Sequence, residues 1–359
     1  MALAGGHPAG FDYLRVILAL LVILDHSFAV TVTDRSQIFG WFASYMLFAP
    51  VIPAFFALSG FLVAGSLERS RSLISFGGLR VLRIVPALAV DTIFCAFLLG
   101  PWLTALPLEA YFTSPLFFTF LSNVTGDIHY YLPGLFVSNP AGARVNGQLW
   151  TIPFELLCYV SLSAFALFGL YKKPAYFVAA AAITGTFIAS YYATHSPNSV
   201  WHHALPVPSF LLGVALFALR QRVRYSPWLA TVALVGLGVS SLNPWLRFFA
   251  PIPIVYLTMY LGLTNPRRVW PITTGDYSYG LYLYGFPIQQ TLVQLSLGRN
   301  AMFNFGYSIA LTGLLALASW HLLEKRVLTQ KPRLYRLEQW LSDVRPGLYR
   351  FLKLGRPSE

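Results

Sequence analysis

The chain has 359 residues, of which 56% are hydrophobic and 11% are charged. Because a soluble globular domain carries about 25% charged residues, this composition excludes an ordinary soluble protein and indicates a polytopic membrane protein. The formal net charge of +12 comes from basic residues in short clusters between apolar runs, which is the pattern of the positive-inside rule. We therefore expect no nucleic-acid partner.

Apolar stretches long enough to cross a membrane recur along the whole chain. A transmembrane helix needs about 20 predominantly apolar residues, and windows of that length predict an all-α bundle of about ten spans. The predicted spans are Phe11–Val32, Ser44–Leu67, Ile84–Leu106, Leu149–Tyr171, Ala175–Thr194, Ala204–Leu219, Pro227–Leu242, Trp245–Leu263, Ile272–Leu297 and Phe303–Leu323.

The basic residues orient these spans. Of the 25 lysines and arginines, twenty fall in one set of connections and four in the other, with Arg15 inside the first span. Since cytoplasmic connections carry the excess of Lys and Arg, we expect both termini in the cytoplasm. The first run lacks a basic leader and a following cleavage pattern, so we expect it to be retained as a span.

Cysteines and histidines do not indicate a disulfide framework or a metal centre. Cys95 and Cys158 both lie inside apolar runs, without the spacing of paired metal ligands. His195, His202 and His203 have no carboxylate at ligand-like spacing. We therefore expect no metal site.

Three segments outside the spans have patterns of their own. Residues 107–148, on the predicted outer side, include the apolar stretch Tyr111–Leu121 and are expected to be partly ordered. Glu68–Arg83 is expected to lie along the cytoplasmic surface. Beyond a membrane domain of residues 1–328, residues 329–359 predict a basic amphipathic tail helix, split near Pro346-Gly347, with a solvated tail as the alternative.

The first span carries a cation and an imidazole on one face. Arg15 and His26 are eleven residues apart, so they are rotated by about 20° and lie about 16 Å apart along a helix. Such groups inside a membrane usually face the protein interior and bind or react there. The alternatives are a structural histidine and an arginine that extends to the interface.

Arg80 and Arg83 share a helix face at the predicted cytoplasmic mouth of the third span. Membrane anchoring alone explains such a pair. Guanidinium groups also bind phosphate oxygens in a bidentate manner, and Arg15 at the same membrane face completes a predicted three-cation site.

Glu155 lies at a depth in the fourth span that matches the depth of His26 in the first. A carboxylate that meets an imidazole fixes its tautomer and raises its basicity, which prepares a general base. The alternative is that Glu155 accepts a hydrogen bond from a backbone group freed by Pro153.

Three further carboxylates fall within the spans. Asp25 adjoins His26 but points about 100° away from it, Asp91 is a candidate partner for an arginine, and Asp276 is expected to cap its helix. Elsewhere, Gly60 and Ala64 have the spacing that lets two helices pack closely.

Several of these motifs occur in an order that resembles the acyltransferase-3 family, whose members are integral membrane enzymes that acylate sugars of the cell envelope. The motifs are Arg15 with His26, Phe56-Ala57-Leu58-Ser59-Gly60-Phe61-Leu62, Arg80 with Arg83, Leu149-Trp150 before Glu155, and Ser278-Tyr279-Gly280-Leu281-Tyr282-Leu283.

The resemblance implies a ten-span fold in the bacterial inner membrane and an acyl-CoA, such as acetyl-CoA, as cytoplasmic co-substrate, with no permanently bound cofactor. It assigns His26 to catalysis, places Glu155 in the site, and assigns Arg15, Arg80 and Arg83 to the donor. In one departure, many members follow the Tyr-Leu motif with a His-Trp-Pro-like sequence, where this chain has Tyr284-Gly285-Phe286-Pro287.

We therefore predict an O-acyltransferase that moves an acyl group, expected to be acetyl, to a hydroxyl of a cell-envelope or exported polysaccharide or its lipid-linked precursor. His26 acts as general base or accepts the acyl group itself. The outer connection is expected to contact the carbohydrate through Tyr130, Tyr131, Asn146 and Trp150, and a polysaccharide-assembly complex is a candidate partner.

Two rival functions stay open. A proton-coupled transporter or flippase of a glycolipid or anion would use Arg15, His26 and Glu155 as a relay, but it predicts inverted repeats that we do not find in the sequence. A non-catalytic scaffold explains the spans and leaves the intramembrane charges unexplained.

Overall fold

The computed structural model describes residues 8–171, 173–195, 205–269, 272 and 275–354, and the elements it assigns within these ranges are helical. Five helices within these ranges are long and apolar enough to cross a membrane by length and composition. They are Ala9–Val30, Trp41–Arg69, Leu73–Leu103, Gly147–Leu167 and Ala301–Val344. The protein is a helical membrane bundle, as its composition predicts.

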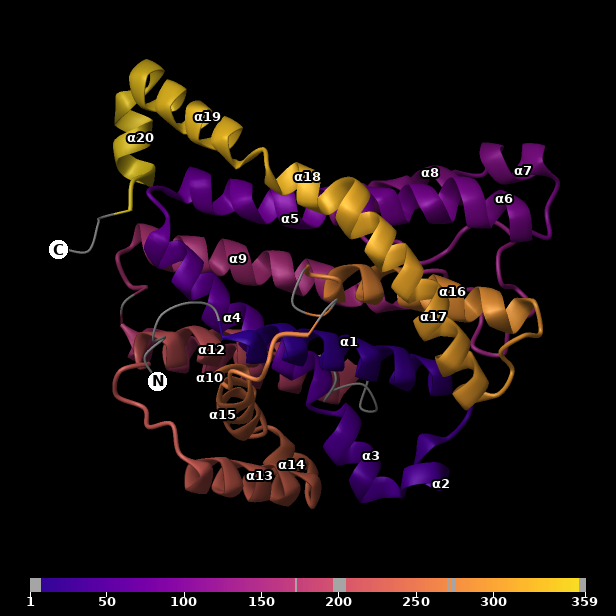
Figure 1. Ribbon diagram of the computed structural model, residues 1–359, viewed down its shortest axis with the longest axis horizontal. Coiled ribbons are helices and arrows are strands. Elements are labelled where there is room, and N and C mark those ends of the chain that lie inside the picture. Colours follow the sequence, from indigo (N-terminus) through magenta and orange to yellow (C-terminus); the bar gives the residue numbers. More distant parts are fainter. Residues whose placement is uncertain (1–7, 172, 196–204, 270–271, 273–274, 355–359) are drawn as a thin grey trace.

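A helix lies at each of the ten predicted positions (Figure 1). In chain order these are α1 (Ala9–Val30), α3 (Trp41–Phe48) with α4 (Val51–Arg69), α5 (Leu73–Ile93) continued by a π-helix and α6 (Gly100–Leu103), α9 (Thr151–Leu167), α10 (Pro174–His195), α12 (Pro206–Ala218), α13 (Pro227–Ser241), α14 (Pro244–Arg247) with α15 (Pro251–Gly262), α16 (Ser278–Gln294) and α17 (Ala301–Ser319). The number of membrane crossings and the side of the termini stay predictions.

Helix α1 lies in the middle of the bundle, where it contacts α4, α15, α16 and α17. Its apolar face is buried through Leu14, Leu18 and Val22. Toward its C-terminal end, the side-chain amide of Gln289 on α16 donates to the Ile23 carbonyl and to the Ser27 hydroxyl, both at 2.7 Å. The helix that carries Arg15 and His26 is therefore enclosed by protein on several sides.

Helices α4 and α12 pack closely because glycines meet backbone across their interface. A Cβ atom at Gly60 would lie 2.1 Å from the carbonyl oxygen of Phe210, and one at Gly213 would lie 2.4 Å from that of Ala57. Only glycine permits approaches this close. The close-packing role predicted for Gly60 is confirmed.

The prediction that Glu68–Arg83 lies along the cytoplasmic surface is wrong for most of that segment. Helix α5 begins at Leu73, where the Ser72 hydroxyl accepts from the backbone N–H of Ser75 at 3.2 Å, and it continues without a break past Arg83. A serine N-cap starts the helix, and it continues through Gly77-Gly78 although glycine is a poor helix former. Arg80 and Arg83 therefore stand on the helix that enters the bundle.

Residues 107–148 are ordered, as predicted. They form α7 (Leu108–Thr113), α8 (Pro115–Leu121) and two 3₁₀ turns, Ser122–Thr125 and Gly147–Trp150. Tyr111, Phe117 and Phe120 are buried in a small core with Cys95 and Leu99 of the third predicted span. This packing fixes the connection against the bundle beside α5 and α6 (Figure 1).

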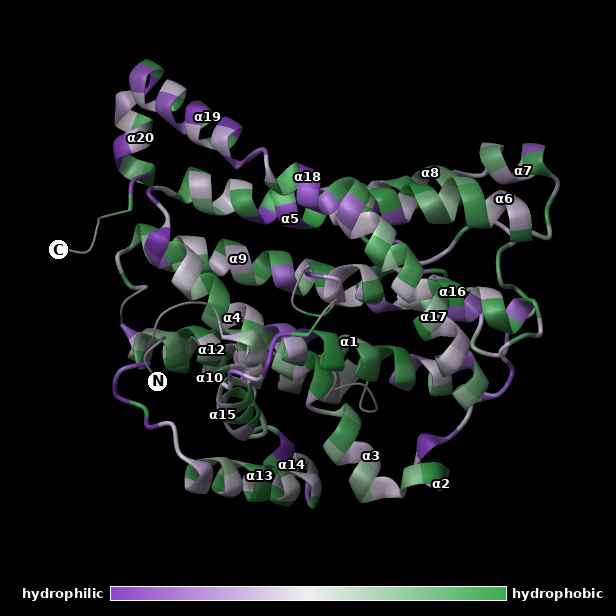
Figure 2. Ribbon diagram, viewed as in Figure 1, coloured by the Kyte–Doolittle hydropathy of each residue, from purple (hydrophilic) through white to green (hydrophobic). Residues whose placement is uncertain are grey.

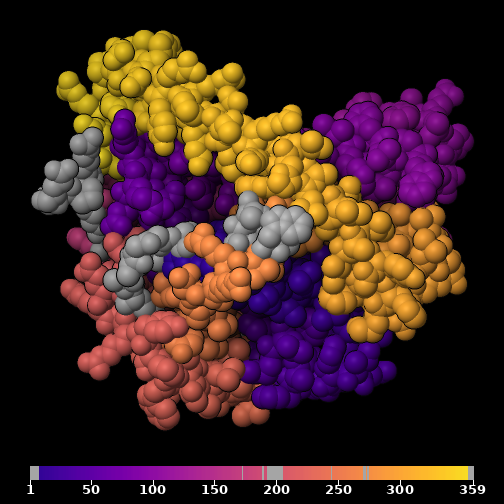
Figure 3. Space-filling model, in the orientation of Figure 1, coloured from indigo at the N-terminus to yellow at the C-terminus, as the bar shows by residue number. Residues whose placement is uncertain are grey.

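The C-terminal tail forms α19 (Lys331–Val344) and α20 (Pro346–Leu352), after the short α18 (Lys325–Leu328), and it is split at the predicted proline. The Ser75 hydroxyl of α5 donates to the buried carboxylate of Glu338. Hydrophilic and hydrophobic residues are interleaved along α19 (Figure 2), and the tail covers part of the bundle in the space-filling view (Figure 3). It is therefore docked on α5 rather than solvated.

Candidate active site

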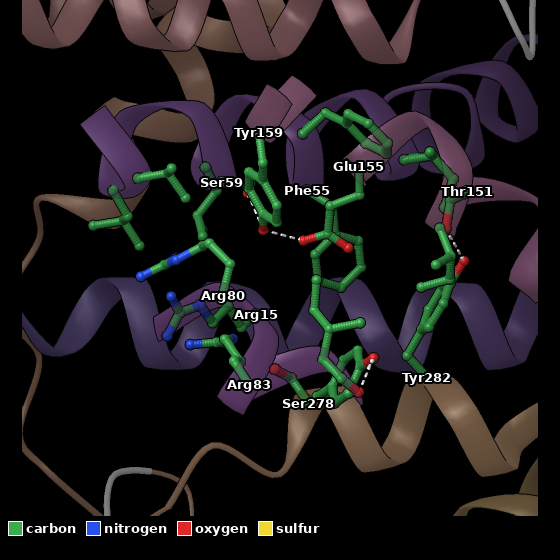
Figure 4. A pocket seen from close by; sticks show the side chains of 18 residues that line it. Arg15, Phe55, Ser59, Arg80, Arg83, Thr151, Glu155, Tyr159, Ser278 and Tyr282 are labelled. Carbon is green, nitrogen blue, oxygen red and sulfur yellow. Dashed lines mark hydrogen bonds between the residues drawn. The ribbon is translucent and has the colours of Figure 1, made fainter. Parts of the chain in front are cut away.

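Two adjoining cavities lie along α1. The first, which we call the arginine cavity, has a volume of about 130 Å³. The three predicted donor residues and Glu155 all line it, with side chains from α1, α4, α5, α9 and α16. Figure 4 shows the guanidinium groups of Arg15, Arg80 and Arg83 at one end and Tyr282 with Thr151 at the other.

Asp276 holds two of the three arginines together. Its Oδ2 atom lies 3.4 Å from Nη1 of Arg15 and also forms an ion pair with Arg83. Its Oδ1 atom accepts from the Ser278 hydroxyl at 2.6 Å, at the start of α16. The predicted helix cap is wrong, because the N-cap residue of α16 is Tyr277, without a side-chain cap hydrogen bond, and the sequence reasoning missed the role of Asp276 in the arginine cluster. The available signal was its place beside the same predicted membrane face as Arg15 and Arg83.

Arg80 differs from the other two arginines because no carboxylate pairs with it among the described residues. Its Nη2 atom donates to the Ser66 hydroxyl at 3.1 Å, and its guanidinium carbon lies 5.8 and 5.9 Å from the ring centres of Phe76 and Tyr159. Its buried Nε has no hydrogen-bond acceptor. A buried donor without an acceptor is unfavourable, so this guanidinium is suited to an incoming anion.

Glu155 faces the arginine cavity and accepts a hydrogen bond from the Tyr159 hydroxyl, one helical turn further along α9. Within the described chain, no hydrogen bond joins it to His26 or to a backbone group. Neither the predicted contact with the imidazole nor the alternative based on Pro153 is seen.

The second cavity, which we call the histidine cavity, has a volume of about 660 Å³. It is lined by Val22, Asp25, His26, Ala29, Phe48, Ala49, Val51, Ile52, Pro53, Tyr130, Ala141, Arg144, Gly147, Trp150, Tyr282 and Phe286. The His26 ring packs edge-to-face against Phe286, with ring centres 5.1 Å apart. No hydrogen bond to either ring nitrogen occurs among the described residues, so neither nitrogen is occupied by a partner within them.

Ile52 and Tyr282 line both cavities and form the boundary between them. The Tyr282 hydroxyl donates to the carbonyl of Gln148 and lies 2.6 Å from the Thr151 hydroxyl. A path from the arginines to His26 would therefore pass a tyrosine whose hydroxyl is held by Gln148 and Thr151.

The structure corrects two predictions for the outer connection and one for the third span. Asp91 is buried and accepts from the Asn146 side-chain amide at 2.7 Å, so its predicted pairing with an arginine is wrong. Asn146 is equally buried, and Tyr131 does not line the histidine cavity, so neither is placed to contact a sugar there. Tyr130 and Trp150 do line it.

The residues that replace the family's His-Trp-Pro-like sequence lie beside His26, the catalytic candidate. Gly285 packs against α1, since a Cβ atom added to Gly285 would lie 3.2 Å from the Ile23 side chain. The ring of Phe286 contacts the ring of His26. Among the described residues, no second histidine lines either cavity. Of the three histidines considered for a metal, His202, His203 and the side chain of His195 lie outside the described residues.

Comparison with known proteins places this arrangement in a family. The acyltransferase-3 family model, described as "Acyltransferase domain", matches residues 9–323. The chain belongs to the acyltransferase-3 family. No solved structure matches it.

Two relatives of this acyltransferase-3 member align over nearly their whole length. The chain is 28% identical over 342 residues to a protein named "O-acetyl transferase" of Shigella phage Sf6, covering 89% of this chain and 96% of the relative. It is 24% identical over 350 residues to "Nodulation protein 10" of Rhizobium leguminosarum bv. viciae, covering 90% and 94%. The family match includes every residue that lines the two cavities, so the protein is an acyltransferase whose candidate site lies inside the matched domain.

Proposed function

We propose that this protein transfers an acetyl group from cytoplasmic acetyl-CoA to a hydroxyl of a cell-envelope or exported polysaccharide, or of its lipid-linked precursor, in the bacterial inner membrane. The observation that carries the proposal is the pair of adjoining cavities on α1. One gathers three arginines and the other presents His26. A relative named O-acetyl transferase supports the choice of the acetyl group.

The arginine cavity suits the phosphates of the donor. Arg80 has an unsatisfied donor and no carboxylate partner among the described residues, whereas Asp276 pairs with Arg15 and Arg83, and Asp12 lies 4.0 Å from Arg15. Phosphate oxygens match the planar fork of guanidinium donors. About 130 Å³ is small beside the roughly 300–1,000 Å³ of ligand pockets, so the cavity would hold only part of the donor. The phosphates would lie at the arginine end, and the pantetheine arm would extend toward Tyr282.

In the histidine cavity, a ring nitrogen of His26 would take the proton of the acceptor hydroxyl as its oxygen attacks the thioester carbonyl. The carbon–sulfur bond then breaks, and the CoA sulfur leaves with the proton returned from the imidazolium. In the alternative, a ring nitrogen attacks the thioester carbonyl, the carbon–sulfur bond breaks and CoA leaves as the thiol with the proton of the imidazole. The acceptor hydroxyl then attacks the acyl-histidine, the nitrogen–carbon bond breaks, and the hydroxyl proton returns to the imidazole.

The test is acetyl transfer by the purified protein in lipid nanodiscs, with radiolabelled acetyl-CoA and cell-envelope glycan. We expect label in the glycan with wild-type protein, and none with His26→Ala, which should still bind acetyl-CoA. The proposal fails if wild-type protein binds no acetyl-CoA or transfers no acetyl group to any glycan fraction.

A second experiment separates the two roles of His26. The protein is incubated with labelled acetyl-CoA without acceptor, quenched and digested. Label on the peptide that contains His26 would establish the acyl-histidine route. An unlabelled peptide together with normal transfer would support the general base.

A further inference from the structure

Among the described residues that line the histidine cavity, Arg144 carries the one side-chain charge that no ion pair neutralises. Among the lining residues, Asp25 and Arg144 are the ones with charged side chains. Asp25 forms an ion pair with Arg35, which belongs to α2 (Arg35–Phe39), and the same guanidinium packs over the ring of Phe48 at 4.9 Å. Asp25 is thereby neutralised inside the cavity wall.

Arg144 has no such partner. Within the described part of the chain, no ion pair or side-chain hydrogen bond engages its guanidinium, and the residue is exposed while it also lines the cavity. These two facts place its charge at the mouth, where an incoming ligand would pass.

The backbone at Arg144 is held firmly although its side chain is unpaired. The Gln290 amide of α16 donates to the Arg144 carbonyl at 2.9 Å and to the Gly142 carbonyl at 3.0 Å. On the other side, residues 131 and 144 form a β-bridge, and the N–H of Val145 donates to the Tyr130 carbonyl at 2.7 Å. The fixed backbone keeps the base of this side chain beside the cavity, while the guanidinium stays free to meet a ligand.

We infer that Arg144 binds an anionic group on the acceptor, so that the histidine cavity selects acidic glycans. The inference rests on the proposed function and names its acceptor class: a sugar chain with a carboxylate, as in a uronic acid, or with a phosphate, as in a glycosyl phosphate. Both groups present two oxygens to the guanidinium fork. Tyr130 and Trp150, which line the same cavity, supply flat amphipathic surfaces for the sugar rings.

The experiment measures binding to the protein in nanodiscs, without donor, by equilibrium dialysis. Three labelled probes share one trisaccharide scaffold: a neutral form, a form that ends in glucuronic acid, and a form with a 1-phosphate. We expect at least one anionic probe to bind about tenfold more tightly than the neutral one, in line with a charge-assisted hydrogen bond. Whichever anionic probe binds more tightly identifies the group.

The variants test the residue. Arg144→Gln should remove the preference, whereas Arg144→Lys should keep part of it, because an ammonium retains the charge without the fork. Arg299→Gln changes another exposed arginine that does not line the cavity, and it should have no effect. The preference should also weaken as salt rises.

The inference is overturned if wild-type protein binds the three probes equally, if it binds none of them, or if Arg144→Gln keeps the preference. Binding of labelled acetyl-CoA and acetyl transfer are measured in the same nanodiscs. If acetyl-CoA binding and acetyl transfer are absent while the anion preference is intact, the proposed function is overturned and the anion site is still supported.

Discussion

The arginine cavity and the histidine cavity lie next to each other on α1 but are built in different ways. The first is small, and it is lined by the guanidiniums of Arg15, Arg80 and Arg83 and by the carboxylate of Glu155, with Asp276 paired to two of these arginines. The second is about five times larger, at about 660 against 130 Å³, and its carboxylate is neutralised by an arginine from outside. The small cavity with three arginines fits the phosphates of a donor whose structure does not vary. The larger cavity fits acceptors of varied shape.

Two residues lie between the cavity proposed for the donor and the cavity proposed for the acceptor. Tyr282 and Ile52 are shared by both cavities, and the tyrosine hydroxyl is held by Gln148 and Thr151. A thioester that enters from the arginine end must pass this point to meet His26. Five substitutions test this division, from the largest expected effect to the smallest.

His26→Ala should lower acetyl transfer by roughly 10²- to 10⁴-fold, the usual contribution of a general acid–base group. The Kd for acetyl-CoA should stay unchanged because His26 lies outside the arginine cavity. Transfer is followed with labelled acetyl-CoA and donor binding by equilibrium dialysis. A matching loss of donor binding would mean that the two cavities are one functional site.

Arg80→Ala should weaken acetyl-CoA binding by about 10- to 100-fold, from the loss of charge-assisted hydrogen bonds, while thermal stability changes little. Arg83→Ala should weaken binding and also lower the melting temperature, because it removes a partner of Asp276. Arg222→Ala, an exposed arginine outside both cavities, is the control. Unchanged donor binding in Arg80→Ala would remove the donor role from this cavity.

Tyr282→Phe should lower transfer by about fivefold, since a hydrogen bond contributes about 1 kcal/mol. It should also raise the fraction of acetyl-CoA that is hydrolysed, because the boundary between the cavities loses its link to Gln148 and Thr151. The measurement is the ratio of free acetate to acetylated glycan. Thr119→Val, on the exposed face of α8, is the control, and an unchanged ratio in Tyr282→Phe would count against Tyr282 as a barrier.

Glu155→Gln should have the smallest effect, a change of about threefold or less in the KM for acetyl-CoA, in the range of a modest hydrogen-bond contribution. From its place beside Tyr159 the carboxylate acts on the arginine cavity, so the pH dependence of kcat should not move. A clear shift of that pH profile would instead support the pairing of Glu155 with His26.

Much of the fold followed from local pattern. The apolar runs predicted the helix positions, Pro346 predicted the split in the tail, and the small residue Gly60 predicted close packing. The start of α5 was missed because the arginines after Leu73 looked like a surface segment. Their side chains instead face a cavity inside the bundle.

By itself, the sequence determined that this is a helical membrane acyltransferase with Arg15 and His26 on one face of its first span. It also determined that Arg80 and Arg83 stand on one helix face. These features depend on composition, motif order and the 3.6-residue helical repeat, all of which are local.

Only the tertiary structure decided which partner each charged side chain has. Arg83 pairs with Asp276, 193 residues away, Asp91 meets Asn146 rather than an arginine, and Glu155 faces Tyr159 rather than His26. Helical periodicity fixes which face a side chain is on but not which helix packs against that face. Partners across the bundle are set by the packing of all the helices together.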